Sequence, residues 1–132
     1  MLTRIIELPR FLDERGNLSF VEQCKEIPFE IRRVYWVYDV PGGEDRDGHA
    51  YFTSQEIIIP LSGCFDVVVD EGDGPCTFRL DRSYKGLYIP PGTWRKIENF
   101  ATNSVALVIA STDFAEKDYE RDYQRFIEWK RK

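Results

Sequence analysis

Short apolar segments alternate with clusters of turn-forming residues along most of the chain. β-Branched and aromatic residues dominate the apolar segments, and Gly, Pro, Asp and Asn gather between them. The segments span residues 31–40, 54–61, 64–69, 76–80, 86–89 and 104–111. Polar and apolar positions alternate only partially within them, which is typical of strands covered on both faces. This spacing predicts an all-β fold, a sandwich or a barrel.

The C-terminal residues follow a helical period instead. Asp113 and Glu116 have the spacing of a capping box. An amphipathic stripe then follows at Tyr119, Tyr123, Phe126, Ile127 and Lys130. The pattern predicts a terminal α-helix lying on the sheet. Packing is favoured over a ligand platform for the tyrosine-rich stripe, and covering a subunit partner is a further alternative.

Composition and charge narrow the function classes. The chain has 132 residues, of which 42% are hydrophobic and 14% aromatic, so residues 1–132 should form one domain with a sizeable core. The net charge is −5 and the basic residues are scattered among acids, which argues against nucleic acid as a partner. A small anionic ligand held by a few arginines is compatible with this charge.

The sequence also bears on location and redox state. Apolar runs reach only six residues, whereas a membrane helix needs about 20. The first 16 residues contain three acids where a signal peptide would be apolar. We therefore expect a cytoplasmic protein with no membrane association. The odd set Cys24, Cys64 and Cys76, without a CxxC pair, predicts core or strand cysteines and neither disulfides nor a zinc site.

Residues 43–63 resemble the first signature of the cupin superfamily, in which a glycine precedes H-x-H, a glutamate and a second glycine. Here the polar positions are His49, Tyr51 and Glu56. Period-two spacing places His49 and Tyr51 on one face of a strand, pointing into a small jelly-roll barrel or sandwich. Residues 90–99 match the second signature except that Arg95 replaces its histidine.

These departures argue against a metal. Metal-dependent cupins use the four positions that hold His49, Tyr51, Glu56 and Arg95 here. A guanidinium is permanently charged and offers no lone pair, so Arg95 would repel a metal ion. His49 and Glu56 alone would leave the metal underligated. We predict an acid/base site without metal or other cofactor.

His49 is the only histidine in the chain and the candidate general base. Tyr51 could donate to, or accept from, a sugar oxygen, although it would need help from Arg95 to act as a base. Arg95 could equally stabilise an enolate oxygen, and packing roles for Tyr51 and Arg95 are an equal alternative. For Glu56, a buried ion pair with Arg95 or another arginine is favoured over proton transfer.

Over nearly its whole length the chain resembles the small cupins that act as sugar-nucleotide 3,4-ketoisomerases, the WxcM-like family. The matching blocks are residues 12–18, 27–35, 46–51, 61–63, 86–94 and 110–111 followed by 118–123. The resemblance implies a metal-free homodimer that converts a dTDP-linked 4-keto-6-deoxyhexose to its 3-keto isomer for the synthesis of polysaccharide aminodeoxysugars. In that reaction a base removes the C-3 proton, an enediol forms and a proton returns at C-4.

Within this resemblance His49 is the base and Arg95 the enolate partner, and Tyr35 is a pocket residue. The candidates for binding the diphosphate are Arg15, Arg33 and Arg46, each with a surface ion pair as the alternative. The family usually has a second histidine where this chain has Tyr51. Arg15 and Arg95 stand at positions where the family varies with the C-4 epimer formed, so that epimer is not predicted.

The missing histidine leaves three functions open. Tyr51 could perform the second proton transfer of an isomerase, or the chain could be a sugar-nucleotide binder without turnover. The third reading is a related epimerase acting beside the same ketone.

Overall fold

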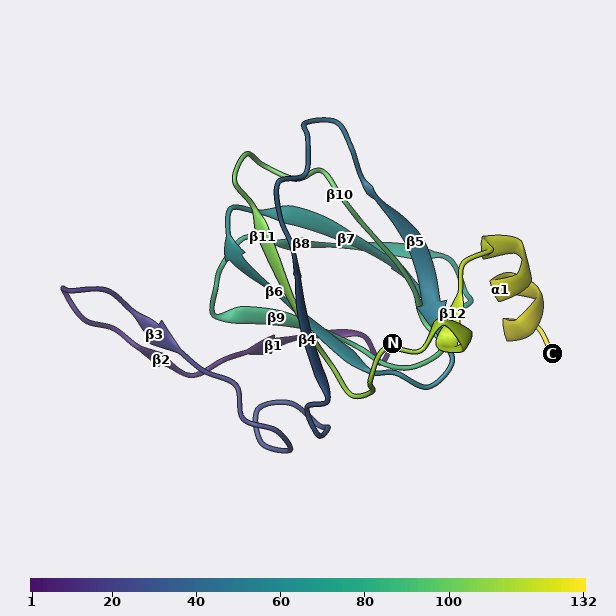
Figure 1. Ribbon diagram of the computed structural model, residues 1–132, viewed down its shortest axis with the longest axis horizontal. Coiled ribbons are helices and arrows are strands. Elements are labelled where there is room, and N and C mark those ends of the chain that lie inside the picture. Colours follow the sequence, from purple (N-terminus) through teal and green to yellow (C-terminus); the bar gives the residue numbers. More distant parts are fainter.

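Two five-stranded antiparallel sheets face each other in the computed structural model, which describes residues 1–46 and 48–132 (Figure 1). The first sheet has the order β1 (Arg4–Glu7), β9 (Lys85–Ile89), β6 (Glu56–Ser62), β11 (Val105–Ala110) and β4 (Arg33–Val37). The second has the order β12 (Tyr119–Glu120), β5 (Arg46–Tyr51), β10 (Trp94–Glu98), β7 (Phe65–Asp70) and β8 (Pro75–Leu80). The remaining elements are the hairpin of β2 (Arg10–Phe11) and β3 (Leu18–Ser19), the 3₁₀ turn η1 (Glu116–Asp118) and the helix α1 (Tyr123–Lys130).

This arrangement confirms the predicted all-β sandwich of the cupin type with a C-terminal helix. Each of the six predicted segments contains a strand, β4, β6, β7, β8, β9 or β11. The apolar pattern did not predict β10, because Arg95 occupies one of its inward positions and is 2% exposed. A cation in a core position breaks the pattern from which strands are recognised.

The core lies between the sheets, and a second apolar layer covers the first sheet from outside. Phe65, Val67 and Val69 of β7 alternate inward and meet Ile58 of β6. On the other face, Ile27 and Phe29 from the loop before β4 cover Ile57 and Ile59 of the same β6 strand. Both faces of β6 are therefore buried, which explains its continuous apolar run. Each such side chain contributes about 1.5–3 kcal/mol by leaving water.

The predicted start of the terminal helix is wrong. The helix α1 begins at Tyr123, and its N-cap is Asp122, whose carboxylate accepts a hydrogen bond from Arg125 N at 3.1 Å. Asp113 is not the helix cap, because the 3₁₀ turn η1 and the short strand β12 lie between Asp113 and the start of α1. Tyr119 pairs with Tyr51 as part of β12 and does not belong to the helical stripe.

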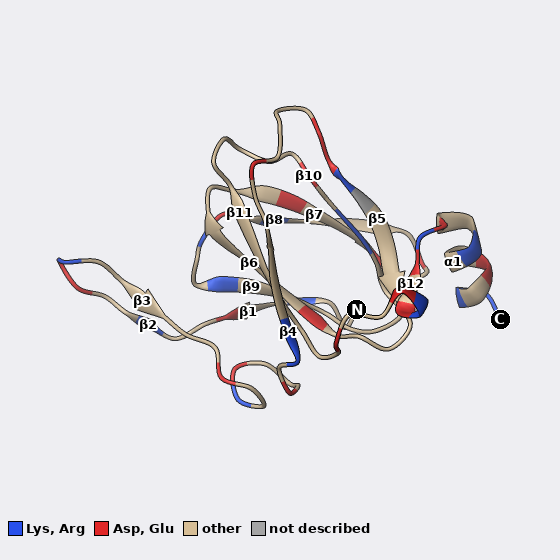
Figure 2. Cartoon of the chain, in the orientation of Figure 1, with Lys and Arg blue, Asp and Glu red and all other residues tan. Residues whose placement is uncertain are grey.

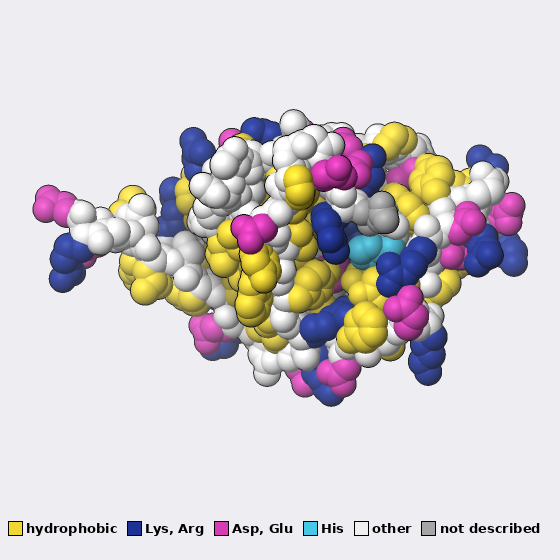
Figure 3. Space-filling model, turned by 45° about the horizontal axis from the view of Figure 1, so that its top comes forward, with side chains coloured by type: hydrophobic (Ala, Val, Ile, Leu, Met, Phe, Trp, Pro, Cys, Tyr) yellow, Lys and Arg dark blue, Asp and Glu magenta, His cyan; other side chains and the backbone are white. Residues whose placement is uncertain are grey.

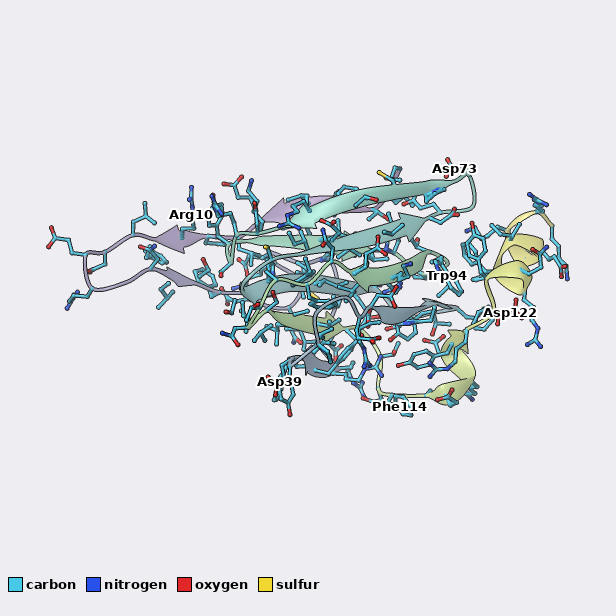
Figure 4. All side chains as sticks on the ribbon, turned by 90° about the horizontal axis from the view of Figure 1, so that it is seen from above. Arg10, Asp39, Asp73, Trp94, Phe114 and Asp122 are labelled. Carbon is cyan, nitrogen blue, oxygen red and sulfur yellow. The ribbon has the colours of Figure 1, made fainter. Side chains whose placement is uncertain are left out.

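Trp94 connects α1 to the second sheet. Trp94 lies at the end of the sheet that faces α1 (Figure 4). The Phe126 ring of α1 is completely buried, and its centroid lies 5.7 Å from that of Trp94. On β5, Gly48 faces the same indole, and a Cβ built at Gly48 would lie 2.6 Å from Cζ2 of Trp94. Only glycine allows the β5 backbone and the indole to approach this closely.

The β2–β3 hairpin projects from the sandwich on the side opposite α1 (Figure 1). It exposes Phe11, Leu12 and Leu18, at 62%, 71% and 57%. Acidic and basic segments are interspersed along the chain (Figure 2). No helix in the described part of the chain is long and apolar enough to cross a membrane.

The cysteines follow the prediction only in part. Cys76 lies on β8 and packs against the core, and Cys64 directly precedes β7. Cys24 is exposed in a loop with a φ of 59°, so its assignment to the core or a strand is wrong. All three are free thiols.

Candidate active site

A pocket of about 500 Å³ opens between the two sheets at the end that carries β12. Figure 3 shows the single histidine of the chain in this opening, with cationic side chains around it. The polar and charged side chains that line it are Tyr35, Glu44, Asp45, Arg46, His49, Tyr51, Glu56, Arg95, Lys96, Tyr119 and Arg121. All the predicted site residues except Arg15 and Arg33 line this pocket.

His49 and Tyr51 lie side by side on β5, as their spacing predicts. Their ring centroids are 4.9 Å apart in an edge-to-face arrangement. Arg95 of β10 stands directly opposite His49 in the antiparallel register. Opposed residues in a sheet share a face, so the three side chains reach the same pocket from two neighbouring strands.

Glu56 and Arg95 form a buried ion pair at the pocket floor. Nη1 of Arg95 donates to Oε1 of Glu56, and the two side chains are 2% and 1% exposed. Arg95 Nη2 donates to the Thr93 carbonyl at 3.2 Å, and the Tyr35 hydroxyl donates to Oε2 of Glu56 at 2.6 Å. The ion pair is the one favoured from the sequence, and Glu56 has a partner on each oxygen.

The two inner phenols stay protonated. Burial raises the pKa of Tyr35 far above its usual range, and the negative charge of Glu56 raises it further. Burial and Glu56 likewise raise the pKa of Tyr51, and the positive charge of Arg95 opposes this rise without cancelling it. Tyr51 is therefore a hydrogen-bond donor and is unsuited to act as a base.

Tyr119 is a site residue that the helical reading of the C-terminus missed. Its hydroxyl accepts a hydrogen bond from the Tyr51 hydroxyl at 3.1 Å, and its ring centroid lies 5.1 Å from that of His49. The Arg121 guanidinium carbon lies 4.3 Å from the centre of the Tyr119 ring. Tyr119 does fall in one of the matching family blocks, residues 118–123, which was the available signal.

Asp118 fixes this segment against the sandwich. Its Oδ1 accepts from Thr53 N at 2.8 Å and Thr53 Oγ1 at 2.9 Å, and its Oδ2 accepts from Ser54 N at 3.2 Å. The Asp118 carbonyl accepts from Phe52 N at 3.0 Å. These bonds explain why residues 116–120 form a turn and a strand, because a continuous helix would withdraw this carboxylate from the loop after β5.

The three arginines proposed for the diphosphate lie in different environments. Arg46 is exposed at the pocket rim. Arg33 is half-buried behind the pocket wall, 5.8 Å from the ring centre of Tyr51. Burial lowers the pKa of Arg33, but Tyr51 and Tyr119 outweigh it and raise the pKa. Arg15 lies at the hairpin tip, is 90% exposed and pairs with Asp13, outside the pocket.

The side chains of this pocket do not form a metal centre. Among residues 1–46 and 48–132, no group of three or more His, Cys, Asp or Glu side chains is placed to hold a metal ion. The donor set at the cupin metal positions contains a phenol and a guanidinium paired with the carboxylate. The arrangement provides one imidazole, three phenols and a buried ion pair, which suits proton transfer to and from a polar ligand.

The fold and pocket define a small cupin with an acid/base site. A family model described as "FdtA: WxcM-like, C-terminal" matches residues 1–131. The TDP-4-oxo-6-deoxy-alpha-D-glucose-3,4-oxoisomerase of Aneurinibacillus thermoaerophilus is 35% identical over 126 residues, which cover 96% of this chain and 91% of the relative. The chain belongs to this WxcM-like family.

Solved structures agree with this assignment. A 3,4-ketoisomerase from Helicobacter canadensis has a TM-score of 0.96 and 33% identity, covering 100% of this chain and 99% of the other. The sugar 3,4-ketoisomerase QdtA from Thermoanaerobacterium thermosaccharolyticum, solved in complex with TDP, has a TM-score of 0.95 and 31% identity. That match covers 99% of this chain and 97% of QdtA.

Proposed function

We propose that this protein is a sugar-nucleotide 3,4-ketoisomerase that acts on a dTDP-linked 4-keto-6-deoxyhexose. The observation that carries the proposal is the position of His49, the single imidazole of the chain, beside two phenols in the pocket. The family and the TDP-bound relative support the substrate class.

His49 is the general base in this proposal. It removes the C-3 proton, which the neighbouring ketone acidifies, and returns it at C-4 after an enediol has formed. Arg95 lies at the floor beneath the developing enolate, with its guanidinium carbon 4.9 Å from the Tyr51 ring centre. Positive charge fixed in advance stabilises negative charge at the enolate oxygen.

The remaining predicted residues hold the substrate. Arg46 at the rim and Arg33 behind the wall provide positive charge for the diphosphate. Tyr35 and Glu56 complete the floor beneath the sugar. Arg15 lies outside the pocket of its own chain, so it contributes only if a second copy brings its hairpin there.

We also propose a cytoplasmic homodimer. Strand β4 forms one edge of the first sheet, and Val34 and Trp36 of this strand and the following Tyr38 are 47%, 57% and 58% exposed. An open edge with large apolar side chains is a surface that a partner can cover. The three free thiols are compatible with a reducing compartment. Light scattering at micromolar concentration should give twice the chain mass of 15.5 kDa, and a monomer would contradict the dimer.

One NMR experiment tests the reaction. The protein is incubated with dTDP-4-keto-6-deoxyglucose in D2O, and the C-3 and C-4 protons are followed for wild type and His49→Asn. We expect deuterium at these carbons and a 3-keto product with wild type only. Binding of TDP by calorimetry checks that His49→Asn retains the pocket.

Other outcomes point to the alternatives. Calorimetric binding of the sugar nucleotide without exchange in either protein would indicate a non-catalytic binding cupin. An inverted centre with an unmoved carbonyl would indicate an epimerase. Either result would overturn the isomerase proposal.

A further inference from the structure

Hydrogen bonds link the three pocket phenols, and the longest of them, between Tyr35 and Tyr51 at 3.5 Å, can run in either direction. Tyr35 donates to the Glu56 carboxylate at 2.6 Å, and Tyr51 donates to the Tyr119 hydroxyl at 3.1 Å. A phenol has one hydrogen to donate, so the protons of Tyr35 and Tyr51 are both used within the protein. The Tyr119 oxygen accepts from Tyr51 and keeps its own hydrogen for another acceptor.

Tyr119 is also more accessible from the pocket than Tyr51 is. Tyr51 is 1% exposed and lies near the negative charge of Glu56, which disfavours loss of its proton. Tyr119 is only half-buried, at the pocket wall, so its hydroxyl is accessible to a ligand in the pocket. The Arg121 guanidinium lies 4.3 Å from its ring centre and is held by Glu116, with Arg121 Nε 3.0 Å from Glu116 Oε1.

The position of Tyr119 relative to His49 fits two adjacent carbons. Tyr119 on β12 pairs with Tyr51 of β5, two residues beyond His49. The ring centroids of His49 and Tyr119 are 5.1 Å apart, and both side chains line the pocket. A ligand in the pocket that lies against both rings presents a carbon to the imidazole and the neighbouring oxygen to the phenol.

We propose, on the basis of the isomerase function proposed above, that Tyr119 is a catalytic residue that transfers a proton between the two sugar oxygens. As His49 takes the C-3 proton, the C-3–H electrons form a C-3=C-4 bond. The O-4 atom then takes the Tyr119 proton, which leaves a phenolate and a neutral enediol. Next, the O-3 hydroxyl returns a proton to Tyr119, C-3 becomes the ketone and C-4 takes the proton held by His49.

Both groups end in their starting state, so the cycle needs no co-reactant. Tyr51 is a positioning residue in this cycle, because it donates to the Tyr119 oxygen and stabilises its anionic form. The missing second histidine of the family is then compensated by a phenol on another strand, with Tyr51 behind it.

Tyrosine-to-phenylalanine variants at three positions test the assignment, because each removes one hydroxyl and keeps the ring. The variants are Tyr119→Phe, Tyr51→Phe and the control Tyr123→Phe, whose hydroxyl bonds to Asp70 outside the pocket. The rate of 3-keto product formation is measured by NMR with dTDP-4-keto-6-deoxyglucose. TDP affinity and thermal unfolding are measured in parallel.

We expect Tyr119→Phe to lower kcat by about 100-fold or more, the usual contribution of general acid/base catalysis. Its TDP affinity should remain that of wild type. Tyr51→Phe removes one hydrogen bond to the donor and should lower kcat by about tenfold or less. Tyr123→Phe should retain the wild-type rate.

The opposite order, with Tyr51→Phe far slower than Tyr119→Phe, would overturn the assignment, as would a Tyr119→Phe rate equal to that of Tyr123→Phe. If the Tyr119→Phe protein fails to fold, Tyr51→Phe still tests the assignment. Complete loss of turnover in a folded Tyr51→Phe protein would identify Tyr51 as the proton donor. Absence of exchange and product with wild type would overturn the proposed function, and the Tyr119 assignment with it.

Discussion

The backbone N–H and the hydroxyl of Thr53 both donate to one carboxylate oxygen of Asp118, at 2.8 and 2.9 Å. Thr53 lies two residues after the end of β5, and Asp118 directly precedes Tyr119. The two strands that meet at the pocket are thus joined at their ends. The placement of Tyr119 depends on a carboxylate that itself lies outside the pocket lining.

Asp118→Ala should therefore lower both stability and activity. Loss of the carboxylate leaves the Thr53 and Ser54 N–H groups without their acceptor. Each buried N–H group that stays unpaired reduces the free energy of unfolding by about 1–3 kcal/mol. We expect the fall in kcat to exceed any change in TDP affinity, because β12 moves while the rest of the pocket remains. Lys117→Ala, a change at the adjacent exposed residue, is the control for thermal unfolding and turnover, and an Asp118→Ala protein indistinguishable from it would contradict the role of Asp118.

The effects of substituting Glu56 and Arg95 on the free energy of unfolding should be strongly non-additive. Arg95→Met leaves a buried carboxylate without its cation and should reduce the free energy of unfolding by about 3–5 kcal/mol. Replacing both residues, Glu56→Leu with Arg95→Met, removes both charges and should be less destabilising than the sum of the single changes. Denaturant unfolding of the four proteins measures the coupling, and additive effects would show that the two charges do not interact.

A side chain at position 48 should push against Trp94 and so disturb the packing of α1. In Gly48→Ala the new methyl group meets the Trp94 indole at 2.6 Å, and overpacking of this kind costs about 1–3 kcal/mol. Gly42→Ala is the matched control, because a Cβ at Gly42 meets nothing within 4 Å. Thermal unfolding and tryptophan fluorescence should change for Gly48→Ala alone, and equal melting temperatures for both variants would refute the close contact.

Glu71 should stabilise the fold to an extent that depends on pH. Burial raises the pKa of this carboxyl, but hydrogen bonds from Thr3 and Leu2 outweigh burial and lower the pKa. A carboxyl whose folded pKa is lowered stabilises the fold above its unfolded pKa of about 4.3, and this stabilisation is lost as the pH falls through the folded pKa.

Glu71→Gln should accordingly melt below wild type at neutral pH, and the difference should shrink as the pH falls below about 4. Glu14→Gln on the exposed hairpin serves as the control. A difference between wild type and Glu71→Gln that does not depend on pH would rule out this linkage.

The sequence predicted those parts of the fold in which side-chain pattern and environment agree. The strands from β6 to β9 have apolar inner positions and turn residues at their ends, so their periodicity is visible. The same pattern placed His49 and Tyr51 on one face of β5. The signature spacing brought Glu56 and Arg95 to the same pocket, and the structure joins them as an ion pair.

The remainder depends on contacts between residues distant in the chain. Tyr119 matches a helical stripe by spacing, but the Asp118–Thr53 bonds hold it in a strand, and no local propensity reports a partner 65 positions away. The sequence does not separate Arg33 and Arg46 from Arg15 as candidates for binding the diphosphate. Only the fold distinguishes two arginines beside the pocket from one at the tip of a projecting hairpin.

The single histidine makes the site spectroscopically distinct from the rest of the chain. Every imidazole signal of the untagged protein comes from His49, whose ring lies beside those of Tyr51 and Tyr119. Ring currents from these neighbours make its resonance a sensitive record of ring orientation. The protonation state of His49, the proposed general base, can therefore be followed in the free and the ligand-bound protein without assigning the spectrum or attaching a probe.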